Sequence, residues 1–418
     1  MKKKMLFSFV LVIGFLTLFT SCGNKDDATP DQFTSLTPEQ NKQAIEDAGV
    51  TMLNQLDGVK KLSSVQTLVD FVNLADGTSS PFESVRSFVA PFAKISQNPA
   101  SMMTMRAVST NYKTIAELFS QNTGIFTYNP AKNNWVKSAS STEITFVFPT
   151  KNSSTNNASL TLGNFKSIAS PHVIDLDGAY GVLVTSFDFT VKKQNSQVLS
   201  FAVTGAYNSD GLPSSLTETL SFSEGYTLES TFSNTGSAIN FDQSFKKGSS
   251  VIVSNHLDTK GDFSYNGINT NEDSNDDAAI ANVINSGNVW VNVGNIKVVG
   301  MVDLKSIFAE VPKTINHSRQ SAVDSIATII NKHASIYAKY VDKNEFIAKS
   351  TAYSYPYTDY IYNYSTRKYD QKTYYDLNLK FVFKDGSAMD ESFFNNGFDN
   401  FISQYQNLVN GIQTSYTN

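Results

Sequence analysis

The sequence contains a single cysteine, Cys22, among 418 residues, so no disulfide can form within the chain. A fold of this length must rely on the burial of apolar side chains and on backbone hydrogen bonds. Charged residues are also scarce, at 17% against about 25% in an average soluble domain. The formal net charge of -5 provides no basic field for phosphate groups, which argues against a nucleic-acid partner.

The common enzyme motifs are missing as well. The sequence has no HExxH, GxSxG, CxxC, Walker or Rossmann glycine pattern. Two SxxK patterns occur, at Ser244 with Lys247 and at Ser365 with Lys368, but no KTG sequence accompanies them and so short a pattern arises easily by chance. We therefore predict no catalytic residue, no cofactor and no enzyme activity, and we keep a hydrolase with an unrecognised site as a second alternative.

Two groups of acidic residues could hold a metal ion. Asp273, Asn275 and Asp277 stand at the first, third and fifth places of an EF-hand-like loop, but Ala278 replaces the required glycine and Ile284 replaces the required glutamate. A solvated loop before a helix is the simpler interpretation. We predict no calcium site there.

The second group is His172 with Asp175 and Asp177, whose side chains could bind a metal or move a proton. Asp177-Gly178 is also an ordinary hairpin turn, and we favour this interpretation. The other histidines are isolated in the sequence and are expected to be structural: His256, His317 and His333. No metal site is predicted.

The N-terminus has the pattern of an export signal. Lys2, Lys3 and Lys4 precede an apolar run from Met5 to Phe19, and small residues follow it. The run is shorter than the roughly 20 residues that span a bilayer. Residues 1–21 are therefore predicted to be a signal peptide.

The residues around the cleavage site resemble those of a known class of proteins. Phe19-Thr20-Ser21-Cys22 is similar to a lipobox, although Phe19 departs from its usual aliphatic residue, and Lys25-Asp26-Asp27 resembles the export signal of Bacteroidetes surface lipoproteins. The resemblance covers residues 1–27 only. It implies lipid attachment at Cys22 and an outer-membrane anchor that leaves the protein facing the cell exterior. A thiolate is the nucleophile such an attachment requires, and two or three acyl chains hold a protein stably.

Composition predicts a lipidated tether over 22–36 and a helical segment over 37–120. Thr37-Pro38 begins a helix in which Gln40 can bond back to Thr37 as in a capping box. From Gly124 the hydrophobic period changes from 3.6 to 2, with turn signals such as Asp210-Gly211 between the runs. We predict an antiparallel β-meander of roughly nine to eleven strands over 121–270.

Residues 271–418 alternate between helical and strand patterns, so they form either a separate segment or one fold with the meander. One helix is expected from Ser318 to Tyr340, and another near the C-terminus around Phe398 and Phe401. The predicted class is α+β, a long antiparallel meander whose apolar face is covered by helices from both ends of the chain.

Tyrosines at two-residue spacing form the most distinctive local feature: Tyr353, Tyr355 and Tyr357, followed by Tyr360, Tyr362 and Tyr364. On strands each triplet shares one face, and a break near Thr358 and Asp359 would send the two triplets to different faces. A row of flat rings could stack on sugars. Tyrosine is also a good strand former whose cross-strand pairs stabilise a sheet, and that is the more ordinary explanation.

These patterns lead to one main functional hypothesis and one principal alternative. The chain is expected to be a surface-anchored lipoprotein with a non-catalytic binding or interaction role, which includes glycan capture at the tyrosines. The alternative is an amphiphile carrier with a concave sheet, a likeness at the level of fold only. Its partners would then be the membrane, through the lipid on Cys22, and a glycan or amphiphile ligand.

Overall fold

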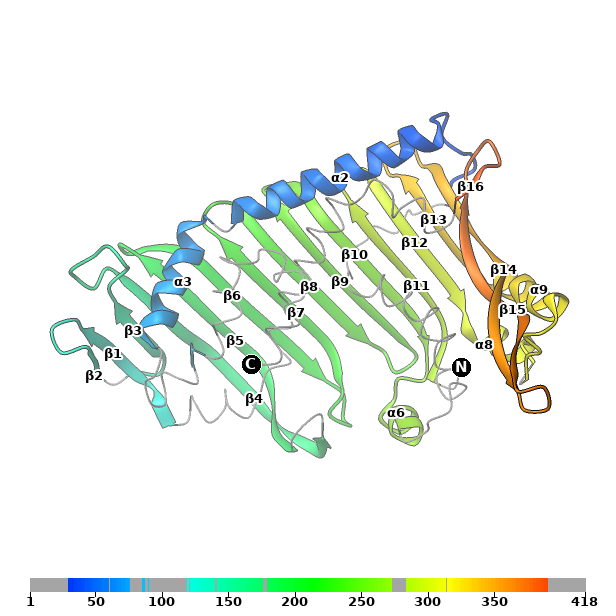
Figure 1. Cartoon of the computed structure of the whole chain (residues 1–418). Coiled ribbons are helices and arrows are strands. Elements are labelled where there is room, and N and C mark those ends of the chain that lie inside the picture. Colours follow the sequence, from blue (N-terminus) through cyan, green and yellow to red (C-terminus); the bar gives the residue numbers. More distant parts are fainter. Residues whose placement is uncertain are drawn as a thin grey trace. The chain divides into compact units, whose positions relative to one another are not determined.

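We describe the protein from a computed structural model (Figure 1). The described residues are 29–59, 61–75, 85, 86, 89, 119, 121–139, 141–175, 179–272, 283–312 and 314–389. Their helices are α2 (Pro38–Val59), α3 (Ser63–Leu74), α6 (Tyr265–Glu272), α8 (Leu304–Glu310) and α9 (Gln320–His333). Among the described residues, none of the helices is long and apolar enough to cross a membrane.

The strands confirm the predicted α+β class with a long, mainly antiparallel sheet. They are β1 (Gly124–Asn129), β2 (Asn134–Ala139), β3 (Ile144–Phe148), β4 (Ala158–Asp175), β5 (Ala179–Lys193), β6 (Ser196–Tyr207), β7 (Pro213–Phe222), β8 (Tyr226–Asn234), β9 (Ala238–Lys247), β10 (Ser250–Gly261), β11 (Ile284–Val293), β12 (Ile296–Asp303), β13 (Ala334–Tyr340), β14 (Glu345–Asn363), β15 (Lys368–Val382) and β16 (Ala388–Met389). Their order is β16-β15-β14-β13-β12-β11-β10-β9-β8-β7-β6-β5-β4-β3-β1-β2 in a 16-stranded sheet. The one departure from sequence order comes at β1, which pairs in parallel with β3.

The chain divides into two compact units. Of the described residues, unit 1 contains those from 29 to 49, from 236 to 239 and from 255 to 389, and unit 2 contains those from 50 to 235 and from 240 to 254. Each has its own apolar core of alternating strand residues.

In unit 2, helix α3 packs on the first strands of the sheet. Phe71 of α3 lies with its ring centroid 5.2 Å from that of Phe146 and 5.4 Å from that of Phe148. Strand β3 has the alternating burial that its sequence ITFVF predicts. Glu224 accepts hydrogen bonds from the backbone N–H and hydroxyl of Ser64, at 3.3 and 3.0 Å, which places a carboxylate at the positive end of α3.

In unit 1, the first turns of α2 pack on one face of the sheet. The predicted capping box is confirmed, since Gln40 Oε1 accepts from the Thr37 N–H at 2.9 Å and Thr37 Oγ1 accepts from the Gln40 N–H at 3.2 Å. The core cluster beneath consists of Ile296, Ala338, Tyr340, Ile347, Ala348 and Phe383, against which Ala44, Ile45 and Ala48 of α2 pack. The buried Tyr340 hydroxyl donates to Asn41 Oδ1 at 3.0 Å.

Part of the expected tether belongs to the folded unit 1. Phe33 forms a parallel bridge with Phe346, and the Thr34 N–H donates to the Phe346 carbonyl at 2.8 Å. Phe33 is the one aromatic residue of that segment, and it packs partly buried against the cluster of Trp290, Val299, Tyr337 and Phe346. Partial burial of this ring and the backbone bonds to Phe346 explain why the segment does not simply extend into solvent.

The helix expected from Ser318 to Tyr340 is shorter than predicted. Helix α9 ends at His333, and Tyr337 and Tyr340 lie on β13. Strand β13 pairs with β12 on one side and with β14 on the other. Two ladders of backbone hydrogen bonds therefore outweigh a helical pattern that continues weakly past His333.

Candidate binding surface on a projecting hairpin

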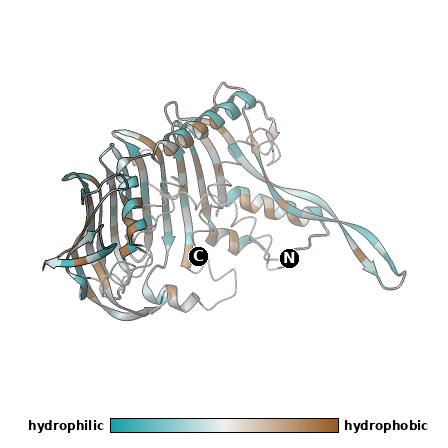
Figure 2. Ribbon diagram, turned by 60° about the vertical axis from the view of Figure 1, so that its left-hand side comes forward, coloured by the Kyte–Doolittle hydropathy of each residue, from teal (hydrophilic) through white to brown (hydrophobic). Residues whose placement is uncertain are grey.

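All six tyrosines singled out in the sequence lie on one long hairpin of unit 1. Strands β14 and β15 pair without a register shift from Lys349 opposite Val382 to Asn363 opposite Lys368. The turn follows at Tyr364, and Arg367 takes a positive φ of 53° there. Figure 2 shows the hairpin running out beyond α9 as a two-stranded ribbon. Both faces of its outer half are therefore accessible to solvent and to a ligand.

Two residues, Asn331 and His317, form hydrogen bonds to the backbone at the base of the hairpin, as a neighbouring strand would. Asn331 of α9 accepts from the Ala352 N–H at 2.7 Å and donates to the Ala352 carbonyl at 2.8 Å. On the opposite edge, the Tyr375 N–H donates to the His317 carbonyl at 2.8 Å, and His317 Nδ1 lies 2.9 Å from the Tyr375 carbonyl. The projecting part therefore begins just beyond Ala352 and Tyr375.

Alternation along an unbroken strand decides which tyrosines share a face. Tyr353, Tyr355 and Tyr357 have odd numbers and lie on one face, and Tyr360 and Tyr362 have even numbers and lie on the other. Tyr364 follows the end of β14, and its ring contacts that of Tyr362. The break expected near Thr358 and Asp359 is not present, since the register passes straight through them. The two triplets lie on different faces for a simpler reason, because Tyr357 and Tyr360 are an odd number of positions apart.

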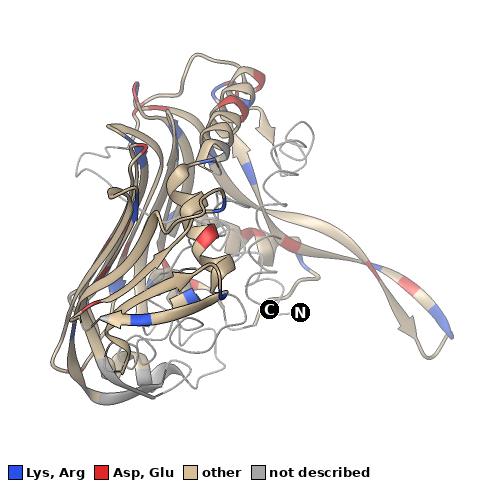
Figure 3. Ribbon diagram, turned by 90° about the vertical axis from the view of Figure 1, so that its left-hand side faces the viewer, with Lys and Arg blue, Asp and Glu red and all other residues tan. Residues whose placement is uncertain are grey.

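The first of these faces is charged. Beyond Tyr357 it carries Asp359 on β14, with Asp370 and Lys372 opposite on β15. Figure 3 shows such acidic and basic residues on the outer part of the hairpin. The Tyr357 and Tyr374 rings stack across the strands with centroids 5.8 Å apart. Burial, followed by the charges of Asp376 and Asp359, raises the pKa of Tyr357, so its hydroxyl stays neutral at physiological pH.

Along the paired strands of the outer hairpin, the other face carries no charged residue, and Arg367 lies in the turn beyond them. We call it the uncharged face, and it consists of Thr358, Tyr360 and Tyr362 of β14 and Tyr369, Gln371 and Thr373 of β15, together with Tyr364, whose ring contacts that of Tyr362. Tyr360, Tyr364 and Tyr369 are 62%, 87% and 69% exposed. Tyr362 meets the Tyr364 ring at 89° and the Tyr369 ring at 66°, with centroids 5.1 and 5.2 Å apart. The expected row of flat rings is therefore an edge-to-face cluster whose outer rings leave their surfaces open.

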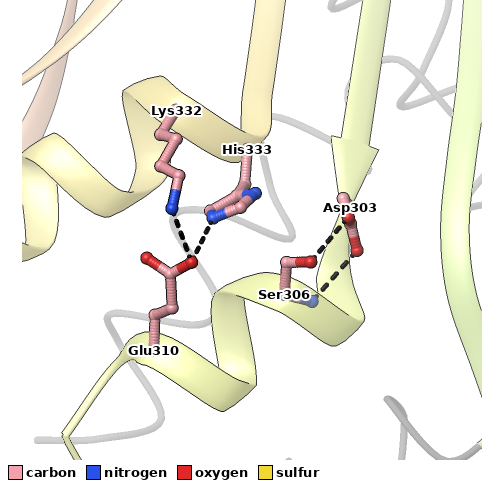
Figure 4. Close-up of polar contacts among 5 residues, drawn as sticks. All are labelled: Asp303, Ser306, Glu310, Lys332 and His333. Atoms are coloured by element: carbon pink, nitrogen blue, oxygen red, sulfur yellow. Dashed lines mark hydrogen bonds and ion pairs between the residues drawn. The ribbon is translucent and has the colours of Figure 1, made fainter.

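Figure 4 shows a polar cluster of unit 1 that brings acid and base groups together. Lys332 Nζ and His333 Nε2 lie 2.7 and 2.8 Å from Glu310 Oε1. Hydrogen bonds from Lys332 and then from His333 hold the pKa of Glu310 below its usual range. Both partners belong to the last turn of α9, so the cluster ties the ends of α8 and α9 together and places the Lys332 cation at a helix C-terminus.

The same figure shows the serine nearest to this cluster, Ser306. Its hydroxyl donates to Asp303 Oδ2 at 2.7 Å, and its backbone N–H donates to Asp303 Oδ1 at 3.0 Å. These bonds lower the pKa of the Asp303 carboxyl. The pair forms the N-cap of α8, and the lowered pKa of the Asp303 carboxyl makes it a weak base for activating the Ser306 hydroxyl.

The other candidate sites are placed as follows. Ser244 and Lys247 lie three residues apart on β9, which sends their side chains to opposite faces. His172 and Asp175 lie on β4, while Asp177 and the loop from Asp273 to Asp277 lie outside the described residues. Within the described part of the chain, no group of three His, Cys, Asp or Glu residues could hold a metal ion.

The residues of the predicted anchor also lie outside the described part of the chain: Cys22, Lys25, Asp26 and Asp27. His256 stacks on Trp290 with centroids 5.6 Å apart. With His317 at the hairpin base and His333 on Glu310, each of the three histidines expected to be structural has a partner in the fold.

An amphiphile carrier would need room beneath its sheet. On β5 and β6 of unit 2, Phe187, Phe189, Phe201 and Val203 retain at most 7% exposure. The Phe189 and Phe201 rings stack with centroids 5.4 Å apart. At these positions the apolar face of the sheet is covered by other parts of the chain.

Comparisons of the chain with protein-family models, with curated proteins and with solved structures found no match. The candidate surface therefore rests on this chain's own residues. Sequence reasoning had not included Tyr369 and Gln371, which the hairpin register adds to the surface. Similar tyrosine-rich runs on either side of Ser365 and Thr366 were the signal that the two strands form one hairpin.

Proposed function

We propose that the protein is an exported, lipid-anchored binding protein without catalytic activity, and that the uncharged face of its hairpin binds neutral glycans. The observation that carries this proposal is the exposure of Tyr360, Tyr364 and Tyr369 on a face without charge, at the outer part of the hairpin. A fold does not by itself need exposed aromatic rings at such a place.

The residue types on this face suit a sugar chain. The apolar surface of a tyrosine ring can stack on the C–H groups of a pyranose, and its hydroxyl remains free to hydrogen-bond. Gln371 adds an amide that both donates and accepts, and Thr358 and Thr373 add hydroxyls. Since no cation lies on this face along the paired strands, its strand residues offer nothing specific to a sulfated or acidic polymer.

The proposed location of the protein supports the same function. A lipid on Cys22 would hold the protein at the outer membrane, and Lys25-Asp26-Asp27 would send it to the cell exterior. There the projecting hairpin could meet polysaccharides before they enter the cell. The carrier and hydrolase alternatives have weaker support, because the apolar side chains of β5 and β6 are covered by the chain and Ser306 is held in the N-cap of α8.

A binding assay with paired variants tests the ligand. Neutral polysaccharides and an oligosaccharide array are presented to wild type and to Tyr360→Ala, Tyr364→Ala, Tyr360→Phe and Tyr355→Ala. We expect Tyr360→Ala and Tyr364→Ala to weaken binding at least about fivefold, in line with the energy of one aromatic contact.

The two other variants are matched controls. Tyr360→Phe keeps the ring and should stay within about twofold of wild type, and Tyr355→Ala removes a ring from the charged face and should have no effect. Equal losses for Tyr355→Ala and Tyr360→Ala, or the lack of binding to any glycan by folded wild type, would refute the glycan proposal.

A separate experiment tests the anchor. Cys22→Ser should abolish labelling by a fatty-acid analogue and leave unlipidated precursor or soluble protein, because serine lacks the thiolate nucleophile. Replacing Lys25, Asp26 and Asp27 by alanine should keep the lipid but protect the protein from protease added to whole cells. Unchanged acyl labelling of Cys22→Ser would rule out the anchor, and equal digestion of the triple variant would rule out the export signal.

A further inference from the structure

The outer edge of the hairpin is a feature distinct from its two faces. In an antiparallel ladder, alternate residues turn their N–H and C=O groups away from the partner strand. Tyr375 shows which residues of β15 do so, because both of its backbone groups bond to His317 outside the hairpin. Along the unbroken register, the next outward-facing residues toward the tip are Thr373, Gln371 and Tyr369.

Nearer the base, the outward amides of β15 have partners in the chain. These are Phe381 paired with β16, Leu379 bonded to the Asn378 side chain at 2.8 Å, Leu377 bonded to the Asp376 side chain at 2.8 Å, and Tyr375 bonded to His317. Beyond Tyr375, no described residue accepts from the outward N–H groups of Thr373, Gln371 and Tyr369. All three residues are exposed. This segment is an open strand edge.

The outer edge of β14 is different. Pro356 faces outward and has no N–H to donate. The outward N–H of Tyr360 is already bonded to Asp359 Oδ1 at 2.8 Å. Exposed strand edges are usually protected in such ways against pairing with other chains. One edge of the hairpin is therefore protected, and the other is open over three consecutive outward positions.

We propose that this edge of β15 pairs antiparallel with the same edge of a second copy of the chain, about a two-fold axis at Gln371. Gln371 then lies opposite Gln371 of the second copy, and Thr373 lies opposite Tyr369. The charges favour a second copy of the chain as the partner of this edge, because Asp370 of each chain lies directly opposite Lys372 of the other. Self-complementarity of this kind is what a two-fold interface between identical subunits requires.

Neighbouring registers lack this complementarity. A shift of one residue would bring outward-facing groups opposite inward-facing ones, so the hydrogen bonds could not form. The two nearest shifts that keep the hydrogen bonds place Asp370 opposite Asp370 or Lys372 opposite Lys372, and like charges directly opposite destabilise a sheet. The alternation of Lys368, Asp370 and Lys372 therefore selects the register centred on Gln371.

The paired hairpins form a four-stranded ribbon. Directly opposite residues of an antiparallel pair point to the same side, so the uncharged faces of both copies make one surface with twice as many tyrosines. The pairing uses only backbone edges and leaves that surface open. This inference does not depend on the ligand, and a chain that binds no glycan would pair in the same way.

Disulfide trapping in the full-length chain tests the register. In Gln371→Cys, the two new cysteines lie opposite each other with Cα atoms about 5.5 Å apart, within the range for a disulfide. In Tyr369→Cys they lie about 14 Å apart along the strands, which is too far. Mild oxidation should convert most of Gln371→Cys to a covalent dimer and leave Tyr369→Cys at the level of wild type, which carries only Cys22.

Charge reversal tests the recognition. In the Gln371→Cys chain, Asp370→Lys places lysine opposite lysine and should lower the dimer yield several-fold, as should Lys372→Asp, which places aspartate opposite aspartate. The double swap restores opposite charges and should recover the yield. High salt should reduce the difference.

Three results would overturn the proposal. One is the lack of a covalent dimer from folded Gln371→Cys, and another is equal trapping of Tyr369→Cys and Gln371→Cys. The third is slow amide exchange at Tyr369 to Thr373 in a chain that sedimentation shows to be monomeric, since the edge would then be covered by something other than a second copy.

Discussion

Two aromatic clusters of this protein have nearly the same contact geometry and opposite surroundings. In unit 2, Phe71 and Phe146 have centroids 5.2 Å apart and an interplanar angle of 56°. On the hairpin of unit 1, Tyr362 and Tyr369 have centroids 5.2 Å apart and an angle of 66°. Both phenylalanines are fully buried, whereas Tyr369 is 69% exposed.

The contact between two rings and the removal of a ring from water are separate contributions to the stability of the fold. An edge-to-face pair contributes about 0.5–1.5 kcal/mol by itself. Removal of a large side chain from water contributes about 1.5–3 kcal/mol more. The phenylalanines have both contributions and the hairpin tyrosines have mainly the first. The phenylalanine cluster therefore holds a core together, and the tyrosine cluster mainly orders a surface.

The largest effect is expected in the buried cluster. Phe146→Ala should lower the free energy of unfolding by about 3–5 kcal/mol, because it leaves a cavity against Phe71 of α3 and Phe126 of β1. Denaturant titration at constant m-value measures this loss. A loss below about 1 kcal/mol would mean that the site collapses around the smaller side chain. The buried and the exposed aromatic clusters would then contribute similar amounts to stability.

Lys297 offers an intermediate case, a buried cation on a buried ring. Its Nζ lies 3.5 Å from the Trp290 ring centroid, and Lys339 lies opposite on β13. Burial, followed by the charge of Lys339, lowers the pKa of Lys297 to about 8. Lys297→Met should therefore stabilise the fold at pH 7 by about 1–3 kcal/mol, after allowance for the lost cation–π contact.

The stability difference between wild type and Lys297→Met should depend on pH. Below about pH 8 the folded chain carries the buried charge, so the cost is fully present. Between about pH 8 and 10.5 the unfolded chain binds the proton and the folded chain does not, so wild-type stability rises toward that of Lys297→Met. Chemical denaturation at pH 7 and pH 10 measures both values. An advantage that grows with pH would contradict the assignment.

The smallest effect is expected on the hairpin. Tyr364 is 87% exposed and has one edge-to-face contact, so Tyr364→Ala should lower the free energy of unfolding by about 0.5 kcal/mol. Tyr362→Ala removes two edge-to-face contacts at once and should cost about twice as much, about 1 kcal/mol. Thermal melting of both variants beside Phe146→Ala places them on one scale. A loss near 3 kcal/mol for Tyr364→Ala would show that the ring is covered.

Much of the architecture could be predicted from local patterns. Alternation over β3 and β5 to β9, with turn residues between them, predicted the meander, because the period of a half-buried strand is two. Thr37 and Gln40 predicted the start of α2, because a capping box uses only groups within one turn. The opposite faces of the two tyrosine triplets also follow from counting, once the strand is known to be unbroken.

Other features depended on residues far apart in the sequence. Tyr337 and Tyr340 fit a helical stripe, and only pairing with β12 and β14 makes them part of a strand. Phe33 stands in a segment with the composition of a tether, and only the cluster around Trp290 explains its place in the fold. No local pattern shows such a partner.

For the candidate surface, the sequence by itself determined which residue types are available, a tyrosine-rich run with its charges in alternate positions. The tertiary structure decided which of those residues are exposed and which backbone edge is open. Asn331 and His317 stop the flanking pairing at Ala352 and Tyr375, and neither contact has any counterpart in local sequence. The physical reason is that alternation sets the direction of a side chain, whereas exposure depends on what else in the chain packs against it.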